Sequence, residues 1–203
     1  MDFNAVVRKR RAVREYTSKA IHRTEVEALL NAAVEAPSAM NIQPWAFAVV
    51  LGREQIDGYA KRAQNWLSMN LSALSNPDIQ GRFEQRMADD PNFTLFYHAP
   101  ALVLVLAKSS DPQAIEDSCL AAQNLMLAAR DHELGTCWIG FARPWLNLPE
   151  IKAELGLPKQ YQVVAPVVLG HPSIWPESHG RKPAEVFWVE TARAKKPPLV
   201  TVS

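Results

Sequence analysis

An unbroken apolar run lies in the middle of the chain and reads Ala101-Leu102-Val103-Leu104-Val105-Leu106-Ala107. Pro100 precedes this run, and the polar residues Lys108-Ser109-Ser110 follow it. A continuous apolar segment of strand length, bounded by turn residues, is typical of a strand in the interior of a sheet. The run therefore predicts the central strand of the fold.

A long helix is predicted after this strand. It begins at Asp111 or Asp117, keeps its apolar residues at helical spacing, and is expected to stop at the glycine of Leu134-Gly135. Further along, the pattern predicts a short strand over 136–141, a short helix over 149–155 and a third apolar strand over 162–169.

Before the central strand, apolar residues at helical spacing predict a helix over 24–35, with Thr24 and Glu27 forming a capping box. A polar loop bounded by Pro37 and Pro44 follows, because proline excludes the helical conformation from the residue before it. The run from Trp45 to Leu51 then predicts a buried strand.

The segment from Gln55 to Phe93 is polar and irregular, and it is expected to be the least packed part of the chain. Helices are predicted over 55–74 and 78–88, separated by Asn76-Pro77. One interpretation is a mobile cover over a pocket, because lids need some apolar surface without full burial. The other is a helical excursion packed on the surface. The apolar residues available to a cover are Trp66, Met69 and Phe83.

Composition limits the class of protein. The chain has 203 residues, of which 48% are hydrophobic, so one domain over 1–203 is expected. Its 22 basic and 21 acidic residues argue against a nucleic-acid protein that relies on a broad positive field. Cys119 and Cys137 have no pair spacing, and the five histidines are scattered, so neither a disulfide framework nor a metal site is expected. The sequence contains neither a secretory signal nor an apolar run of membrane-spanning length, so a soluble cytoplasmic protein is expected.

Three segments carry candidate binding groups. Arg10, Arg11 and Arg14 would offer a fork of donors to a phosphate, although such a cluster is also typical of a solvated face. The loop Pro37-Ser38-Ala39-Met40-Asn41 offers a hydroxyl, an amide and small residues, or is an ordinary turn between helix and strand. The segment Trp138-Ile139-Gly140 offers main-chain groups, or is a buried strand with glycine at a tight bend.

Taken in order, these segments make the chain resemble the nitroreductase family of flavin mononucleotide (FMN) enzymes. The matching segments are Arg10-Arg11-Ala12-Val13-Arg14, Pro37-Ser38-Ala39-Met40-Asn41-Ile42-Gln43-Pro44-Trp45, Leu120-Ala121-Ala122-Gln123-Asn124-Leu125, Gly135-Thr136-Cys137-Trp138-Ile139-Gly140, Gly170-His171-Pro172 and Arg181-Lys182-Pro183. They extend over about nine-tenths of the chain.

The resemblance implies a role for each matching residue. Arg10, Arg11 and Arg181 would hold the FMN phosphate, with a main-chain contact from Ala12. Arg14 would reach the ribityl chain or the pyrimidine edge. Ile139 and Gly140 would place main-chain groups beside the ring. Four residues would line the flavin from a partner subunit: Pro37, Ser38, Ala39 and Asn41. Asn70 is a possible equivalent of a ring-contacting asparagine. Three positions differ from the common family pattern: Ala12 and Ala39, where many members have serine, and His179, where a basic residue is frequent.

The resemblance also implies a fold and an activity. The fold would be an α+β three-layer sandwich with a mixed, mostly antiparallel sheet, forming a homodimer with flavin at the subunit interface. The tail containing Lys195-Lys196-Pro197-Pro198 and Leu199-Val200 would extend over the partner. NAD(P)H would reduce the flavin and leave, and a nitroaromatic, quinone or similar small planar acceptor would follow it. No catalytic side chain is required. The chain lacks a Gly-x-Gly-x-x-Gly fingerprint, so NAD(P)H should bind only transiently, over the flavin.

Two other functions remain open from the sequence. Relatives in this family carry out dehalogenation, flavin destruction or azoline oxidation with the same cofactor. A non-enzymatic anion or nucleic-acid module would instead use Arg8-Lys9-Arg10-Arg11 and the Lys195-Lys196 tail. The segment over 58–95 is expected to shape the acceptor pocket without identifying the acceptor.

Overall fold

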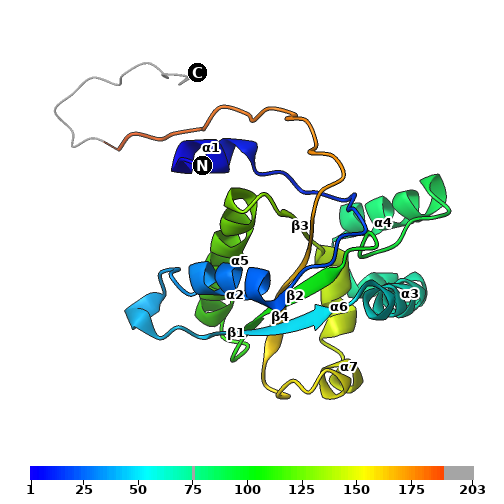
Figure 1. Ribbon diagram of the computed structural model, residues 1–203. Coiled ribbons are helices and arrows are strands. Elements are labelled where there is room, and N and C mark those ends of the chain that lie inside the picture. The colour runs from blue at the N-terminus through cyan, green and yellow to red at the C-terminus, as the bar shows by residue number, and fades with distance from the viewer. Residues whose placement is uncertain (75, 190–203) are drawn as a thin grey trace.

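The computed structural model describes residues 1–74 and 76–189. Their sheet has four strands: β1 (Trp45–Leu51), β2 (Ala101–Ala107), β3 (Gly135–Trp138) and β4 (Gln162–Gly170). The strand order is β1-β2-β4-β3, and neighbouring strands are antiparallel (Figure 1). β2 lies between β1 and β4 and is buried along its whole length, which confirms the prediction of a central strand.

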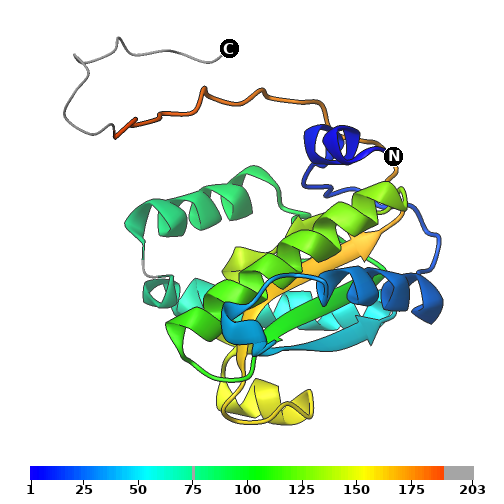
Figure 2. The ribbon, with the colours of Figure 1, turned by 90° about the vertical axis from the view of Figure 1, so that its left-hand side faces the viewer.

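Helices cover both faces of the sheet (Figures 1 and 2). α2 (Arg23–Ala33) and α5 (Pro112–Asp131) pack on one face, whereas α3 (Arg53–Met69) and α6 (Arg143–Leu146) pack on the other. Side chains of β2 alternate between the two layers: Val103 and Val105 face α2 and α5, and Leu104 faces α3. This explains why the strand has no polar position. The predicted α+β three-layer sandwich is confirmed.

The remaining described elements are short helices and turns around this sandwich. They are α1 (Phe3–Lys9), η1 (Ala39–Asn41), η2 (Leu71–Ala73), α4 (Pro77–Asp89), η3 (Gly140–Ala142) and α7 (Pro149–Glu154). η1, η2 and η3 are 3-10 turns. The predicted strand over 136–141 is therefore wrong beyond residue 138, because the chain turns there into η3 and then α6.

Several predicted helix boundaries are wrong. The helix predicted over 55–74 runs from Arg53 to Met69 and is followed by η2, and two other boundaries differ at a helix end. α2 begins at Arg23, so the capping box is formed by His22, whose backbone N–H donates to the Glu25 carboxylate at 2.8 Å, and not by Thr24. α5 ends at Asp131 before Gly135 is reached. Glu133 adopts a left-handed φ of 58°, and the Leu134 N–H donates to the Ala129 carbonyl at 2.8 Å, which closes the helix.

Two burial expectations also need correction. β1 is an edge strand, so Val49 and Leu51 remain partly exposed where a buried strand was predicted. The segment 55–93 is not uniformly loose, because α3 buries Ile56, Ala63 and Leu67 in the core beneath the sheet. The expectation of weak packing holds for α4, whose buried side chain is Phe83.

The C-terminal segment leaves the body of the protein after β4. Pro172 forms an isolated antiparallel bridge with Tyr16, and the Ser173 N–H donates to the Glu15 carbonyl at 3.1 Å. From there to residue 189 the chain is extended and runs past α1 (Figures 1 and 2). The predicted extension of the tail at 195–200 onto a partner lies outside the described residues.

Candidate functional site

The segment that follows α1 pairs with β3 through backbone hydrogen bonds. Ala12 forms a parallel bridge with Thr136, and the Val13 N–H donates to the Thr136 carbonyl at 2.9 Å. The Tyr16 hydroxyl donates to the Val13 carbonyl at 2.7 Å. Gly135 allows this approach, because a Cβ at that position would lie 2.7 Å from the Val13 Cβ. Since Val13 is completely buried, the neighbouring arginines leave the sheet edge at fixed positions.

The three arginines expected to bind phosphate lie near one another. Burial lowers the pKa of Arg10, and the guanidinium groups of Arg181 and Arg11 lower it further. Arg11 donates to the Arg8 and Arg10 carbonyls at 2.6 and 2.7 Å, yet its Nε is buried without a partner. Within the described ranges, none of the three forms an ion pair with a carboxylate. A cluster of cations without a counterion suits a dianion such as a phosphate monoester.

Arg14 stands beside two neutral groups. Its guanidinium carbon lies 5.8 Å from the centre of the Tyr97 ring. Burial raises the pKa of the Cys137 thiol, although Arg14 and Arg10 act to lower it. Burial also raises the pKa of the Tyr97 phenol, despite the nearby Arg14. Both groups therefore stay protonated at neutral pH, and the cluster is positively charged.

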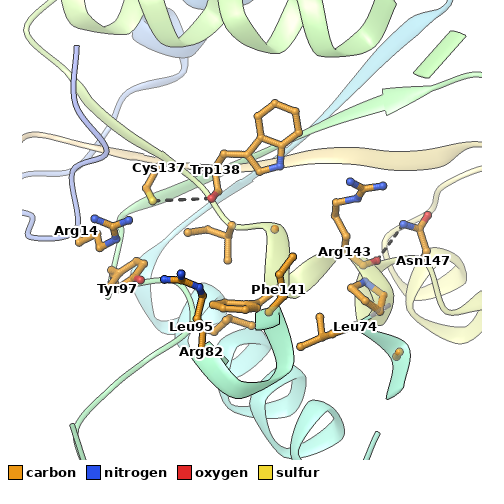
Figure 3. Close-up of a pocket in the computed structure, with 15 residues that line it drawn as sticks. Arg14, Leu74, Arg82, Leu95, Tyr97, Cys137, Trp138, Phe141, Arg143 and Asn147 are labelled. Atoms are coloured by element: carbon orange, nitrogen blue, oxygen red, sulfur yellow. Dashed lines mark hydrogen bonds between the residues drawn. The ribbon is translucent and has the colours of Figure 1, made fainter. Parts of the chain in front are cut away.

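A cavity of about 600 Å³ opens beside this cluster (Figure 3). Its volume lies in the range of sites for small organic ligands. The described residues that line it come from the Arg14 segment, η2, α4, the loop before β2, and the run from β3 to α6. They are Arg14, Ala73, Leu74, Ile79, Arg82, Leu95, Tyr97, Cys137, Trp138, Ile139, Gly140, Phe141, Arg143, Pro144 and Asn147.

The corner between β3 and η3 gives one wall of the cavity. The Ile139 N–H donates to the Pro166 carbonyl of β4 at 2.7 Å, which holds this corner against the sheet. Gly140 follows and is exposed, and a Cβ added there would meet no atom within 4 Å. The backbone at Gly140 therefore faces open space in the cavity, where a flat ring could lie against it.

α4 covers another wall. Phe83 of α4 is almost completely buried, and its ring centre lies 5.3 Å from that of Phe141. This contact anchors α4 over the cavity, in agreement with the interpretation of the segment as a cover. Of the other residues considered for the cover, Trp66 packs against the core and Met69 is largely exposed. Asn70 ends α3, and its side-chain amide donates to the Trp66 carbonyl at 2.8 Å.

The loop before β1 does not reach the cavity of its own chain. Met40, Asn41 and Gln43 all adopt left-handed φ values, of 49°, 56° and 51°. This backbone conformation is energetically unfavourable, and hydrogen bonds within the loop stabilise it. One of them runs from the Gln43 N–H to the Ser38 hydroxyl at 3.0 Å. The Ala39 N–H donates to both carboxylate oxygens of Asp117, at 3.2 and 3.4 Å. These hydrogen bonds tie the loop to itself and to α5, and the Met40 side chain is exposed.

The structure brings together most of the candidate binding residues. Arg14, Ile139 and Gly140 line one cavity, and Ala12 with the cluster of Arg10, Arg11 and Arg181 adjoins it through Cys137. It does not place five others among the residues lining that cavity: Pro37, Ser38, Ala39, Asn41 and Asn70.

Sequence reasoning missed Arg82, Tyr97 and Arg143. Tyr97 adopts a left-handed φ of 53°, which no residue type nearby indicates. Arg82 could have been singled out as the polar neighbour of an anchoring phenylalanine, and Arg143 as the first cation after the glycine turn. Among the described residues, no group of histidine, cysteine or acidic side chains is placed to hold a metal ion. None of the helices in these ranges combines the length and the apolar character needed to cross a bilayer.

Comparison with known proteins identifies relatives over most of the chain. The model of the Nitroreductase family matches residues 7–171. A putative NADH dehydrogenase/NAD(P)H nitroreductase of Archaeoglobus fulgidus is 29% identical over 168 residues, covering 80% of this chain and 81% of that protein. A 4-nitrobenzoate reductase of Pseudomonas putida is 29% identical over 196 residues, covering 84% and 85%. A solved nitroreductase with bound FMN from Bacteroides fragilis superposes with a TM-score of 0.75 at 26% identity, covering 94% of this chain and 100% of that one.

Proposed function

The chain belongs to the nitroreductase family, and on that premise we propose that it is an FMN-dependent oxidoreductase that uses NAD(P)H to reduce small planar acceptors such as nitroaromatics or quinones. One observation carries the proposal. The arginine cluster, which pairs with no carboxylate in the described ranges, adjoins a cavity where the backbone at Gly140 is open, so groups suited to a phosphate and space suited to a ring lie side by side. FMN has a phosphate at one end and a flat ring at the other.

The residues suit the phosphate end of FMN. Arg10, Arg11 and Arg181 provide charged donors that pair with no carboxylate among the described residues, and within these residues the buried Arg11 Nε lacks a partner. Burial is the main cause of the lowered pKa of Arg10, and a phosphate dianion would relieve the repulsion from Arg181 and Arg11 that lowers it further. Ala12 is fixed by its bridge to Thr136, so it can offer backbone contact without a hydroxyl.

The residues also suit the ring end. When bound, FMN supplies the two-electron chemistry between nicotinamide and acceptor. Arg14 would lie at the pyrimidine edge and stabilise negative charge there, with Cys137 and Tyr97 neutral beside it. Ile139 and Gly140 would support the ring. For a nitroaromatic, two electrons and two protons, from NAD(P)H and one solvent proton, yield the nitroso compound, NAD(P)⁺ and water. No protein acid is required for this balance.

A second copy of the chain would complete the site. Ser38 and Asn41 belong to a hydrogen-bonded loop that does not line the cavity of its own chain, and the loop exposes Met40 and Ile42 to solvent. A loop ordered in advance loses little entropy when it docks, which favours an interface role. We therefore propose a homodimer in which this loop lines the flavin of the other subunit.

Purification under mild conditions tests the proposal. We expect a yellow protein that releases FMN on denaturation, rebinds it stoichiometrically, and is bleached anaerobically by NADH or NADPH. Arg10→Ala and Arg14→Ala should each weaken FMN binding, because each removes a fixed cation. A colourless protein that cannot be reconstituted with FMN would refute the proposal. Tight DNA binding by that colourless protein, falling steeply with salt, would support the anion-binding alternative.

A further inference from the structure

The cavity contains more positive charge than the proposed cofactor uses. The described residues that line it include Arg14, Arg82 and Arg143 but no aspartate or glutamate. Arg14 is assigned to the ring, and the phosphate cations lie outside this lining, at Arg10 and its neighbours. Arg82 and Arg143 are therefore without a role in the proposed cofactor site.

These two arginines reach the cavity from different elements. Arg82 is carried by α4, next to the anchoring Phe83, and Arg143 begins α6 directly after η3. Figure 3 shows Arg82 with Arg14 and Tyr97 on one side of Phe141, and Arg143 on the other side. In the part of the chain that the structure describes, neither guanidinium group is paired with a carboxylate.

Apolar side chains line the cavity together with the two cations, and Phe141 lies between them in Figure 3. Leu74, Ile79 and Phe141 line the same cavity, and Phe141 is fixed by its edge contact with Phe83. A ligand that filled this space would therefore have a flat apolar body with an anionic substituent. Guanidinium groups bind carboxylates through paired donors, so an aromatic carboxylate matches both the shape and the charge.

We infer that Arg82 and Arg143 form an acceptor subsite that selects planar substrates bearing a carboxylate over their neutral counterparts. The inference rests on the proposed function, since the acceptor must reach a flavin in this cavity. The main rival anion is the pyrophosphate of the nicotinamide donor. The acceptor is favoured because the two cations line the cavity together with apolar side chains, whereas a dinucleotide would extend well beyond a cavity of about 600 Å³.

Charge-matched acceptors test this inference with the flavin-loaded protein. The kcat/KM values for 4-nitrobenzoate and methyl 4-nitrobenzoate are compared in the wild type, Arg82→Gln, Arg143→Gln and Arg86→Gln. Arg86 is the matched control. It also lies on α4, its guanidinium carbon is 5.2 Å from the centre of the Phe93 ring, and it is not among the residues that line the cavity. The Kd of benzoate, read from the perturbed flavin absorbance, gives a second measure that needs no turnover.

We expect wild type to prefer the carboxylate over the ester by about ten-fold or more. Arg82→Gln and Arg143→Gln should each reduce this preference by about five-fold and weaken benzoate binding to a similar extent, leaving the ester unaffected. Arg86→Gln should change neither. Arg82→Lys should retain part of the preference, because the charge remains while the paired donors are lost.

Three results would overturn the inference: equal use of carboxylate and ester by wild type, an equal loss for both acceptors in the variants, or a change confined to the KM of NADH or NADPH. The last would assign the arginines to the donor. Menadione, an uncharged quinone, separates these results from failure of the proposed function. If menadione is reduced while the charge preference is absent, only the subsite is wrong, whereas a protein without flavin refutes the function itself.

Discussion

Replacing Gly135 with alanine should destabilise the fold at the point that positions Arg14. The new Cβ would lie 2.7 Å from the Val13 Cβ and 2.8 Å from both of its Cγ atoms, whereas carbon atoms pack at about 4 Å. A Cβ cannot rotate away, so the Val13 segment must retreat by roughly 1 Å. Overpacking of this kind costs about 1–3 kcal/mol, and loss of the Val13 bond to Thr136 adds about 1 kcal/mol.

Urea denaturation of the flavin-free protein measures this effect. We expect the free energy of unfolding to fall by about 2–4 kcal/mol, and FMN affinity to fall because Arg14 moves with Val13. Gly58→Ala is the control, since a Cβ there meets no atom within 4 Å and the site lies within α3. It should raise the free energy of unfolding by about 0.5–1 kcal/mol. Equal stability of Gly135→Ala and wild type would refute the argument from close packing.

Three further changes have defined outcomes. Asp117→Ala leaves the Ala39 N–H without its carboxylate acceptor, so the free energy of unfolding should fall by about 1–3 kcal/mol. Hydrogen exchange at the Ala39 amide should also become faster. An unchanged exchange rate would show that the loop does not depend on this hydrogen bond. Burial raises the pKa of Tyr16 well above its ordinary value of 10.0. The part of the unfolding free energy that depends on the protonated phenol is therefore complete below about pH 10 and is lost at higher pH. Urea titrations should show this alkaline decline, and Tyr16→Phe should flatten it. Phe83→Ala removes a buried ring that contacts Phe141 and should lower the free energy of unfolding by about 3–5 kcal/mol. Limited proteolysis of the variant should then cut within α4 first. First cleavage elsewhere would contradict the role of Phe83 as the anchor of α4.

The core of the fold could be predicted from sequence because its signals are local. β2 and β4 are continuous apolar runs, and the periodicity of α5 extends over several turns. The end of α5 could not be predicted, because it depends on a left-handed Glu133, whereas the glycine that seemed to stop the helix serves close packing against Val13. Periodicity reports which face is buried, but not what a backbone does at a turn.

In the candidate site, too, the residues with a local sequence signal could be predicted and the others could not. The arginines at 10, 11 and 14 were predicted because they stand together in the sequence, and the late Arg181 because the family pattern includes it. Arg82 and Tyr97 stand alone in their segments, and they become neighbours of the cavity only when α4 and the loop before β2 fold over η3. A pattern within α4 can mark Arg82 as the neighbour of an apolar anchor, but no pattern within one element shows that Arg82 and Tyr97 meet at one cavity.

The arginine cluster makes the folded state sensitive to its ionic surroundings. Arg10, Arg11 and Arg181 are held together without a carboxylate in the described ranges, so the ligand-free protein retains their mutual repulsion as an electrostatic cost. Any dianion that binds there lowers this cost and stabilises the fold by mass action. Phosphate and sulfate buffers should therefore raise the melting temperature of the flavin-free protein more than chloride at equal ionic strength. Inorganic anions would in this way act as stand-ins for the cofactor's charge, and would compete with it for the same corner of the molecule.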